Sequence, residues 1–420
     1  MQETFKFILI ILILSIVSLI LLVLFSGALR RIFNSRKYKK LDKLRELYRN
    51  KLMTLIHSGE IFHKINDFIP SPNSIEFQAL EDVLFEFMKT AQYRTPAKEL
   101  FQALGYIKYY EGKLSCRNVI TKATAIDKLG TMISEASEDK LIMMLKIKNA
   151  EINSTSIRSL GRIGTKKALI GILEHLPELY QNNLIGHKTV EASLRSFGIS
   201  AQPILVEYGM KFTDVRILSS ILEVLSNMPS TETSASFALH ALNNPDIEVQ
   251  AKALKLIGRS DPSFLRIDFN LLLQYLLDSV WFIRLQAAKV FGKFRFQGAI
   301  DILGNLLLDP NWQVRNAATN ALIQFDDYSL NIFLKALNAR DEYAKQSICE
   351  EIQKSDFVNV LIENLSQDDK DKYEKSRAIL NTMHMLNFST PLIEYMHTGK
   401  NEKVKTELRH IMLQEKDKKQ

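Results

Sequence analysis

The chain has 420 residues, of which 46% are hydrophobic and 24% are charged, and its formal net charge at pH 7 is +8. Its two cysteines, Cys116 and Cys349, form no C-x-x-C pair. This spacing argues against a disulfide framework or a thiolate metal site, and it fits a reducing compartment.

The positive charge belongs to one segment. Residues 30–51 contain ten Lys or Arg and two Asp or Glu, a net of +8, and residues 1–29 contain one charge of each sign. Residues 52–420 therefore sum to zero. A neutral body of this size is poorly suited to neutralising phosphates, so we expect no nucleic-acid partner.

The N-terminal region contains an uncharged apolar run at residues 7–25, interrupted only by two serines. A helix of this length spans roughly 28 Å, close to the thickness of a bilayer's hydrocarbon core. A cleaved signal peptide would need a basic start, a shorter apolar run and a small-residue cleavage site. The sequence therefore predicts a retained transmembrane helix within residues 1–29.

Basic residues follow the apolar run at once, whereas Lys6 is the only basic side chain before it. The positive-inside rule then places the N-terminus outside and the rest of the chain in the cytoplasm, as a single-pass protein of the inner (cytoplasmic) membrane. Residues 30–72 are expected to form a basic juxtamembrane helix and linker. Anionic lipid heads attract each cation by about 1 kcal/mol, and the expected lipid-facing set is Arg30, Arg31, Arg36, Lys37, Lys39 and Lys40.

Residues 73–111 are expected to form a helical N-terminal cap unit, with helices near 74–92 and 96–110. The segment before them, Pro70 to Asn73, contains two prolines and marks a break. Terminal units of stacked repeats depart from the consensus because one face must cap the stack.

Glycines then recur at a fixed interval, each preceded by a large apolar residue. Gly130, Gly164 and Gly198 are 34 residues apart, as are Gly258 and Gly292, and Ser226 takes the glycine position of one further unit. Such self-similarity is typical of stacked repeats, in which no unit buries its apolar face alone. We expect the repeats to fill residues 112–397 and a charged tail to follow at 398–420.

Each repeat is expected to be a helical hairpin, because no segment alternates like a strand. Prolines such as Pro245 and Pro310 fall in the expected turns, where a missing N–H does no harm. Apolar first helices are expected at 168–179, 201–210, 234–242, 269–277, 298–308, 330–337 and 357–365. The fold class is therefore all-α, a solenoid of stacked hairpins preceded by one transmembrane helix.

The expected second helices at 278–292 and 309–322 resemble HEAT repeats, of the armadillo-like kind, and residues 244–258 are a weaker copy. The whole arrangement is similar to single-span HEAT-repeat proteins of bacteria. In that family an Asp and the Arg six residues later are similar to a hydrogen-bonded ladder between hairpins. The resemblance implies structural ladder roles for Asp278, Arg284, Asp309 and Arg315.

The only two tryptophans, Trp281 and Trp312, stand at the same position of neighbouring repeats. Tryptophan is enriched at binding hot spots, but it also buries a large apolar area wherever it can. Packing across the turn between repeats is the favoured interpretation, and a pair of binding anchors is the alternative.

No motif indicates an enzyme, a cofactor or a metal. The glycines follow no strand, and neither G-x-G-x-x-G nor G-x-x-x-x-G-K-[ST] occurs. His57, Glu60 and His63 are the only cluster of histidines with an acid, and their spacing does not converge three ligands on a zinc ion.

The polar positions of the second helices are the expected partner surface, because these helices line the inner curve of HEAT-like solenoids. Their Lys, Arg and amide side chains favour an acidic or extended polar segment of a partner protein. The set is Arg195, Lys252, Lys255, Arg259, Lys289, Lys293, Asn320 and Gln324.

The predicted function is a membrane-anchored cytoplasmic scaffold or adaptor that binds a partner protein at the inner membrane face. The resemblance suggests a cell-envelope enzyme, such as a polysaccharide glycosyltransferase, as that partner. One alternative is a protein similar to the phycobilin lyases, which handle a tetrapyrrole. Another is a HEAT-fold DNA-alkylation repair glycosylase, which the neutral solenoid disfavours.

Overall fold

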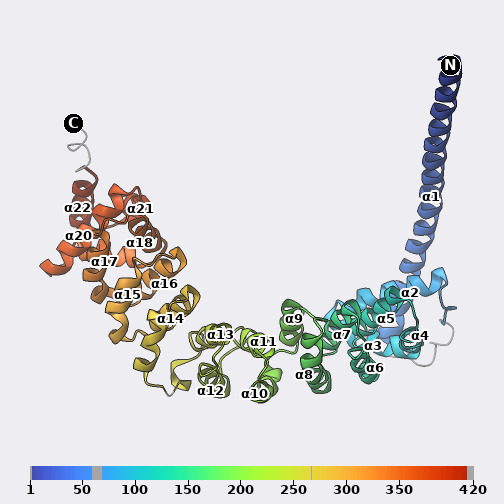
Figure 1. Cartoon of the computed structure of the whole chain (residues 1–420), viewed down its shortest axis with the longest axis horizontal. Helices are drawn as coiled ribbons and strands as arrows, with labels where there is room; N and C mark the ends of the chain where they lie inside the picture. The colour runs from blue at the N-terminus through green and yellow to red at the C-terminus, as the bar shows by residue number, and fades with distance from the viewer. Residues whose placement is uncertain (1, 59–68, 266, 414–420) are drawn as a thin grey trace. The chain divides into compact units, whose positions relative to one another are not determined.

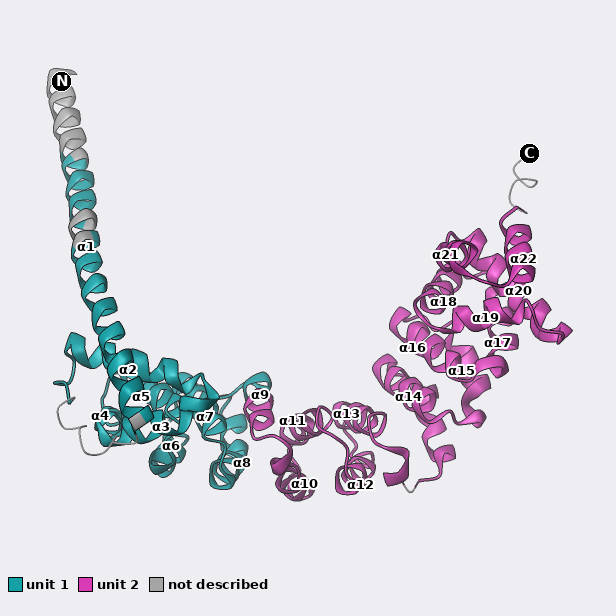
Figure 2. Cartoon of the chain, turned by 180° about the vertical axis from the view of Figure 1, so that it is seen from behind, with its two compact units in different colours: residues 1–189 teal, residues 190–420 magenta. Residues whose placement is uncertain are grey.

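The computed structural model describes residues 2–58, 69–265 and 267–413 (Figure 1). Within the first helix, the side chains of residues 2–14, 17, 27–29 and 32 lie outside this description. All regular structure in the described residues is helical, as the sequence predicted. The contacts divide the chain into two compact units, residues 1–189 and 190–420 (Figure 2).

Unit 1 begins with three helices that precede the hairpins. The first helix joins the predicted apolar run and the predicted basic juxtamembrane helix into one element. Its described side chains become buried only from Leu41 onward, with Leu52 and Leu55, whereas Leu47 is exposed. The three helices pack in sequence order: α1 (Gln2–Ser58), α2 (Ile75–Met88) and α3 (Ala91–Ala103).

The predicted transmembrane helix requires a correction. Within the part of the chain that the structure describes, no helix combines the length and the apolar character needed to cross a bilayer. The predicted single-pass localisation in the inner membrane is therefore wrong. Residues 7–14 and 17 of the predicted span lie outside the described side chains.

Three hairpins complete unit 1, and α9 runs into unit 2. Their second helices begin at capping side chains: Asn118 accepts from the N–H of Thr121, and Asn149 from those of Glu151 and Ile152. The hairpins are α4 (Tyr106–Lys113) with α5 (Val119–Thr131), α6 (Glu138–Met144) with α7 (Ala150–Ile163), and α8 (Lys166–Gln181) with α9 (His187–Ser196).

Unit 2 continues the same pattern, and its second helices pack on one another from α11 to α13, α14, α16 and α18. The hairpins are α10 (Gln202–Lys211) with α11 (Val215–Leu225), α12 (Glu232–Ala241) with α13 (Ile247–Ile257), η5 (Phe269–Leu277) with α14 (Trp281–Phe294), α15 (Ile300–Leu306) with α16 (Trp312–Ile323), α17 (Leu330–Leu337) with α18 (Glu342–Lys354), α19 (Phe357–Asn364) with α20 (Lys370–Met385), and α21 (Thr390–Thr398) with α22 (Glu402–Leu413). Short 3₁₀ segments lead directly into α6, α10, α15 and α17: η2 (Glu135–Ser137), η3 (Ile199–Ala201), η6 (Gln297–Ala299) and η7 (Asp326–Ser329). A further one, η4 (Pro262–Phe264), follows α13.

Two segments differ from their expected form. The apolar segment 269–277 is a 3₁₀ helix rather than an α-helix. It is apolar almost throughout, so its sequence does not distinguish a period of 3.0 from one of 3.6. The expected charged tail contains α22, which packs on α20 and buries Val404, Leu408 and Ile411. Apolar residues at intervals of three and four stabilise this helix against its neighbour.

The recurrent glycines serve two different purposes. Gly164 ends α7 in the left-handed region at φ +75°, which an L side chain rarely adopts. At Gly292 on α14, a Cβ would lie 2.6 Å from the Cα of Ala321 on α16, so this glycine allows the two second helices to pack closely.

Each unit contains one cysteine. Cys116, between α4 and α5 in unit 1, is partly exposed, whereas Cys349 on α18 in unit 2 is fully buried. Burial raises the pKa of the Cys349 thiol to about 12.

Candidate functional site

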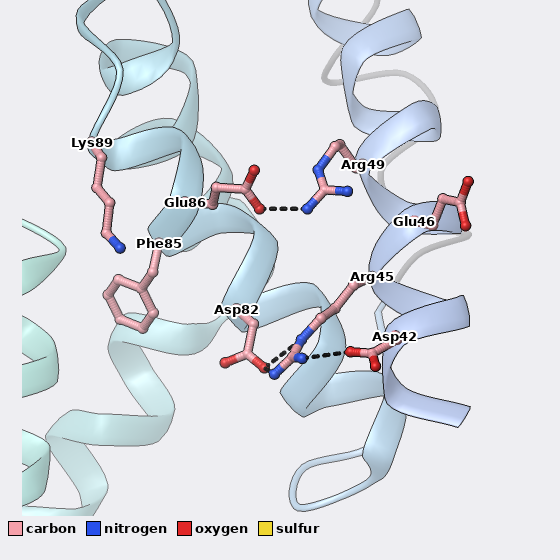
Figure 3. A pocket seen from close by; sticks show the side chains of 8 residues that line it. All are labelled: Asp42, Arg45, Glu46, Arg49, Asp82, Phe85, Glu86 and Lys89. Carbon is pink, nitrogen blue, oxygen red and sulfur yellow. Dashed lines mark hydrogen bonds and ion pairs between the residues drawn. The ribbon is translucent and has the colours of Figure 1, made fainter. Parts of the chain in front are cut away.

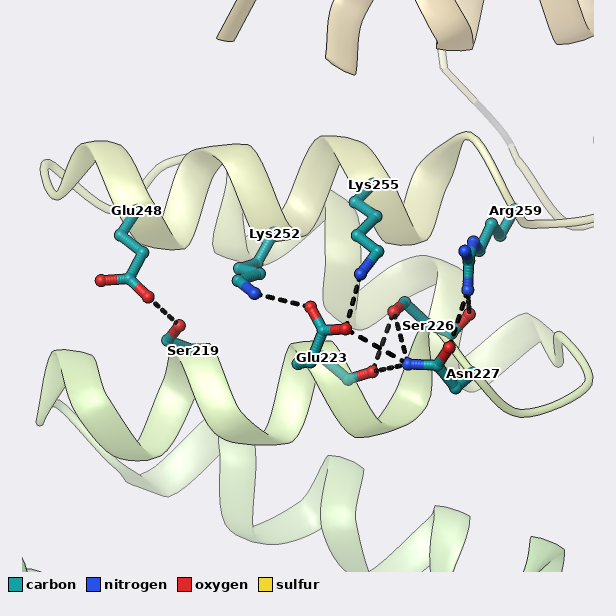
Figure 4. Close-up of polar contacts among 8 residues, drawn as sticks. All are labelled: Ser219, Glu223, Ser226, Asn227, Glu248, Lys252, Lys255 and Arg259. Atoms are coloured by element: carbon teal, nitrogen blue, oxygen red, sulfur yellow. Dashed lines mark hydrogen bonds and ion pairs between the residues drawn. The ribbon is translucent and has the colours of Figure 1, made fainter. Parts of the chain in front are cut away.

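Polar side chains of α11 and α13 are joined by hydrogen bonds in unit 2, as a network around Glu223 and a separate pair (Figure 4). Glu223 on α11 accepts from Nζ of Lys252 at 2.6 Å and from Nζ of Lys255 at 2.5 Å, both on α13. Earlier on the same helices, the hydroxyl of Ser219 donates to Glu248 at 2.7 Å. Two predicted partner-binding lysines therefore already have a carboxylate partner within the chain.

Glu223 is the electrostatic centre of this network. Its side chain is only 13% exposed. Burial alone would raise the pKa of its carboxyl, but the hydrogen bonds and charges of Lys252 and Lys255 outweigh that effect and hold the pKa at about 2. Glu223 therefore stays ionised and cancels one of the two lysine charges.

Further along, three cations have no ion-pair partner within 4.0 Å among the described residues. Arg259, just after α13, donates only to neutral groups, the carbonyl of Ser226 at 2.8 Å and Oδ1 of Asn227 at 3.0 Å. Lys289 and Lys293 are exposed on the neighbouring helix α14. We call Arg259, Lys289 and Lys293 the cation cluster.

Two members of the cation cluster, Arg259 and Lys289, are close enough for their charges to interact. The pKa of Lys289 is lowered, first by partial desolvation and then by the charges of Lys255 and Arg259. One carboxylate lies near the edge of the cluster: the pKa of Asp261 is lowered mainly by hydrogen bonds from Ser263 and to a small extent by Lys293. The cluster keeps an excess of positive charge that a bound anion would stabilise.

The remaining predicted partner residues are more scattered. Asn320 on α16 donates to Glu351 on α18 at 2.6 Å, and Asn316 donates to the other oxygen of the same carboxylate at 3.0 Å. Gln324 and Arg195 are exposed side chains without a hydrogen bond to the cluster in the described structure. The structure thus joins Lys252, Lys255, Arg259 and Lys289, and it assigns Asn320 to a contact within the stack.

Sequence reasoning missed the acidic partners Glu223 and Glu351. Glu223 lies 29 residues before Lys252, and Glu351 lies 31 residues after Asn320. Similar separations occur in unit 1, for example 35 residues between Asp127 and Arg162. Opposite charges about one repeat apart are the signal that could have identified them.

The predicted ladder residues contact each other in a different register. Arg284 donates to both carboxylate oxygens of Asp309 in the next hairpin, at 2.7 and 2.9 Å, and to the carbonyl of Asp278 at 2.7 Å. The Asp278 carboxylate instead accepts from the N–H of Val280. Arg315 likewise donates to the carbonyl of Asp309 at 2.9 Å. Each Arg therefore holds the turn of its own hairpin through a carbonyl, and Arg284 also joins two hairpins.

A second polar site lies between α1 and α2 in unit 1, in a groove of about 750 Å³ (Figure 3). Arg45 donates to Asp82 at 2.6 and 3.0 Å, and Arg49 donates to Glu86 at 2.6 Å. The groove is lined by Phe85 and by three cations and four anions: Asp42, Arg45, Glu46, Arg49, Asp82, Glu86 and Lys89. Because these charges largely cancel, we assign the groove no ligand.

The predicted basic segment lies on the α1 surface before this groove. Arg30, Arg31, Arg36, Lys37 and Lys39 are exposed. Lys40 lies 3.4 Å from Glu76 on α2. At least one of the six cations thus contacts a carboxylate of the chain itself.

Within the described residues, no three His, Cys, Asp or Glu side chains are placed to hold a metal ion. Glu60 and His63 of the cluster considered from the sequence lie outside the described residues.

A family model for HEAT repeats matches residues 235–323 and 269–353. The match covers α13, α14 and α16, which carry most of the network and the ladder. It confirms the resemblance to HEAT repeats over this part of the chain. A search of curated proteins found no match.

Several solved structures are similar at low identity. They include an engineered protein, with 13% identity, a TM-score of 0.36 and coverage of 84% of this chain and 97% of that one. Kap121p has 11% identity, a TM-score of 0.44 and coverage of 81% and 46%. The karyopherin Kap121p bound to the SUMO protease Ulp1p has 10% identity, a TM-score of 0.43 and coverage of 88% and 53%. The chain spans about half the length of these Kap121p chains.

Proposed function

We propose that this chain is a protein-binding scaffold, and that its cation cluster on α13 and α14 binds an acidic segment of a partner protein. The observation that supports this most directly is geometric: Arg259, Lys289 and Lys293 have no ion-pair partner within 4.0 Å among the described residues, and Arg259 donates only to neutral groups. The pKa of Lys289 is lowered by partial desolvation and then by the charges of Lys255 and Arg259, which agrees with this placement. A carboxylate placed there would relieve repulsion among three positive charges and accept hydrogen bonds from them. Hydrogen bonds to charged groups contribute about 1.5–3 kcal/mol each.

The geometry favours a segment rather than a small molecule. The cations lie on two adjacent helices, and Lys289 and Lys293 are one turn apart on the exposed surface of α14. An extended acidic chain can contact all three, whereas small-molecule sites are typically concave and mostly apolar. The predicted membrane-associated partner depended on the inner-membrane localisation, and no helix in the described part of the chain could span a bilayer. No observation on the described residues favours the tetrapyrrole or nucleic-acid alternatives.

The direct test uses the full chain and a fluorescein-labelled (Glu-Gly)₆ peptide in fluorescence anisotropy. We expect saturable binding at low salt that weakens as salt rises. The double variant Lys289→Glu/Lys293→Glu should weaken the affinity at least tenfold. The matched control is Lys335→Glu on α17, the first helix of its hairpin. Lys335 is exposed and has no ion pair in the described structure. This variant should leave the affinity within twofold of the wild type.

Three results would contradict the proposal: no saturable binding of the acidic peptide, equal loss in the control, or no loss in the double variant. The partner itself can then be identified by placing a photocrosslinking residue at position 293 or at control position 335 in cells. A partner bound at the cation cluster should crosslink from position 293 and not from 335.

A further inference from the structure

The opposite end of the second helices presents a row of exposed apolar side chains. Ile247, Trp281 and Trp312 are each the first residue of α13, α14 and α16, and they are 44%, 38% and 60% exposed. Tyr343, the second residue of α18, is 76% exposed. We call these four residues the aromatic edge. The favoured interpretation of the tryptophans, packing across a turn, does not account for a Trp312 that is mostly exposed.

The spacing of the aromatic edge is set by helix packing. The four helices pack on one another in sequence order, and packed helices lie about 8–10 Å apart. Ile247, Trp281 and Trp312, at the same position of successive helices, therefore repeat at about that distance, and Tyr343 lies one residue further along α18. A polyproline II chain advances about 3.1 Å per residue and completes a turn in three residues, roughly 9.3 Å. Every third side chain of such a segment would meet the next member of the edge.

Three of the four helices of the edge are preceded by an aspartate, whereas α16 is preceded by Asn311. Asp246, Asp278 and Asp341 precede α13, α14 and α18, and each uses its Oδ1 to accept from backbone N–H groups. In the described structure their Oδ2 atoms receive no hydrogen bond, and no Lys or Arg forms an ion pair with any of the three. A row of carboxylates with one uncommitted oxygen each is complementary to basic side chains.

An apolar groove adjoins the Ile247 end of the edge. It has a volume of about 790 Å³ and lies within unit 2, between the turns that precede α11 and α13. Met210, Phe212 and Phe237 provide apolar lining, and Asn244 and Asp246 lie at the side shared with the edge. The groove extends the apolar surface by one repeat.

We propose that the aromatic edge binds a proline-rich segment of a partner protein that adopts polyproline II conformation and carries Lys or Arg between its prolines. Proline rings pack flat on exposed aromatic side chains, and the preformed chain loses little conformational entropy on binding. The basic side chains between them would contact the carboxylates of Asp246, Asp278 and Asp341. This surface and its occupant are distinct from the cation cluster and the acidic segment proposed for it.

Three labelled peptides test the proposal with the full chain: (Pro-Pro-Lys)₄, (Pro-Pro-Glu)₄ and (Gly-Ser-Lys)₄. We expect saturable binding of (Pro-Pro-Lys)₄ in fluorescence anisotropy, with an affinity at least tenfold higher than that of either other peptide. Because Trp281 and Trp312 are the only tryptophans, the unlabelled peptide should also shift the intrinsic emission of the protein.

Variants locate the site. Trp312→Ala should weaken (Pro-Pro-Lys)₄ binding at least tenfold, since the side chain is an exposed anchor whose loss leaves the core intact. Asp278→Asn, which keeps the capping acceptor and removes the charge, should weaken it about threefold. Lys289→Glu in the cation cluster should change the affinity less than twofold. The proposal is overturned if (Gly-Ser-Lys)₄ or (Pro-Pro-Glu)₄ binds as well, if no peptide binds up to about 1 mM, or if Trp312→Ala binds normally.

Discussion

The space beside Gly292 is too small for even one methyl group, and this determines how closely α14 and α16 can approach. A Cβ at Gly292 would lie 2.6 Å from the Cα of Ala321, a backbone atom that cannot move away alone, whereas the nearest contacts at Gly258 are 3.4 Å away. Overpacking of this kind typically costs 1–3 kcal/mol.

We therefore expect Gly292→Ala to lower the free energy of unfolding by about 2 kcal/mol in urea titrations followed by circular dichroism. Gly258→Ala is the matched control. Gly258 has a helical backbone conformation, and a Cβ there would be at ordinary van der Waals distance from its neighbours. Alanine at this position should therefore leave the stability of the protein unchanged or raise it by up to about 1 kcal/mol. Equal effects of the two substitutions would show that the glycine interval does not report close helix packing.

Glu223 links stability to pH. Its pKa falls from 4.5 to about 2 on folding, so its ionised form stabilises the folded state by about 3 kcal/mol. For a carboxyl whose pKa is lowered, this contribution is present above the unfolded pKa and is lost as pH falls through the folded one. The difference in unfolding free energy between the wild type and Glu223→Gln should be largest at pH 6–7 and should shrink between about pH 4.5 and 2. A difference that stays constant over this range would contradict the assignment.

At the scale of the elements, the ion pair of Arg284 with Asp309 joins two hairpins. The side chains are 12% and 4% exposed, so removal of one partner leaves a buried charge. The matched pair is Arg162 with Asp127, which also joins two hairpins but is 44% and 50% exposed.

Arg284→Gln should therefore destabilise the protein by about 3 kcal/mol, and Arg162→Gln by less than about 1 kcal/mol, as measured by urea unfolding. If the two variants behave alike, burial does not decide the contribution of these pairs.

The first half of α1 should contribute little to the folded core. The described side chains between Ser15 and Lys40 are exposed, and burial begins at Leu41. Deletion of residues 1–29 should therefore shift the thermal midpoint by less than about 2 °C and leave the circular dichroism per residue nearly unchanged. A larger shift would show that this segment contacts the folded core.

Helices could be predicted from the sequence where their apolar residues or glycines recur at a regular spacing, and their form could not be predicted where such spacing is lacking. The glycine interval and the apolar spacing predicted the hairpins, because a 34-residue repeat requires one packing unit per period. The 3₁₀ form of η5 could not be predicted from its nearly uniform apolar sequence. Residues 398–420 were predicted to be a charged tail because most of them are charged or polar. The structure shows that three apolar side chains among them are buried: Val404, Leu408 and Ile411.

The candidate site was predictable only in part for a similar reason. The row of second-helix positions follows from periodicity within a helix, and it led to the prediction of Lys252, Lys255, Arg259 and Lys289 as partner-binding residues. Which of these cations already has a partner depends on the neighbouring helix, about 30 residues away. Glu223 neutralises part of the row from that distance, and no pattern within α13 indicates it.

At the scale of the whole molecule, residues 52–420 carry no net charge, so binding must depend on local groups of like charge. Unit 2 offers two such groups of opposite sign on the same helices. Along α14, Trp281 precedes Lys289 and Lys293 by eight and twelve residues, about 12–18 Å. This exceeds the Debye length of about 8 Å at physiological salt.

The acidic and the basic peptide should therefore bind to one molecule independently. We expect the affinity for (Pro-Pro-Lys)₄ to change less than twofold when (Glu-Gly)₆ is saturating, measured at 0.15 M salt. Competition would indicate that both peptides use one surface, and it would contradict a scaffold with two separate sites.

The two cysteines provide one natural thiol-labelling site in each unit. Cys349 is inaccessible and, with its pKa near 12, almost entirely protonated, so a thiol reagent can modify it only when α18 opens. Cys116 is partly exposed in unit 1 and needs no such opening. The labelling rate of each thiol can be followed by mass spectrometry as the denaturant concentration rises. The concentration at which Cys349 becomes reactive then reports the opening around α18, and Cys116 in unit 1 serves as the reference. No added probe or mutation is needed.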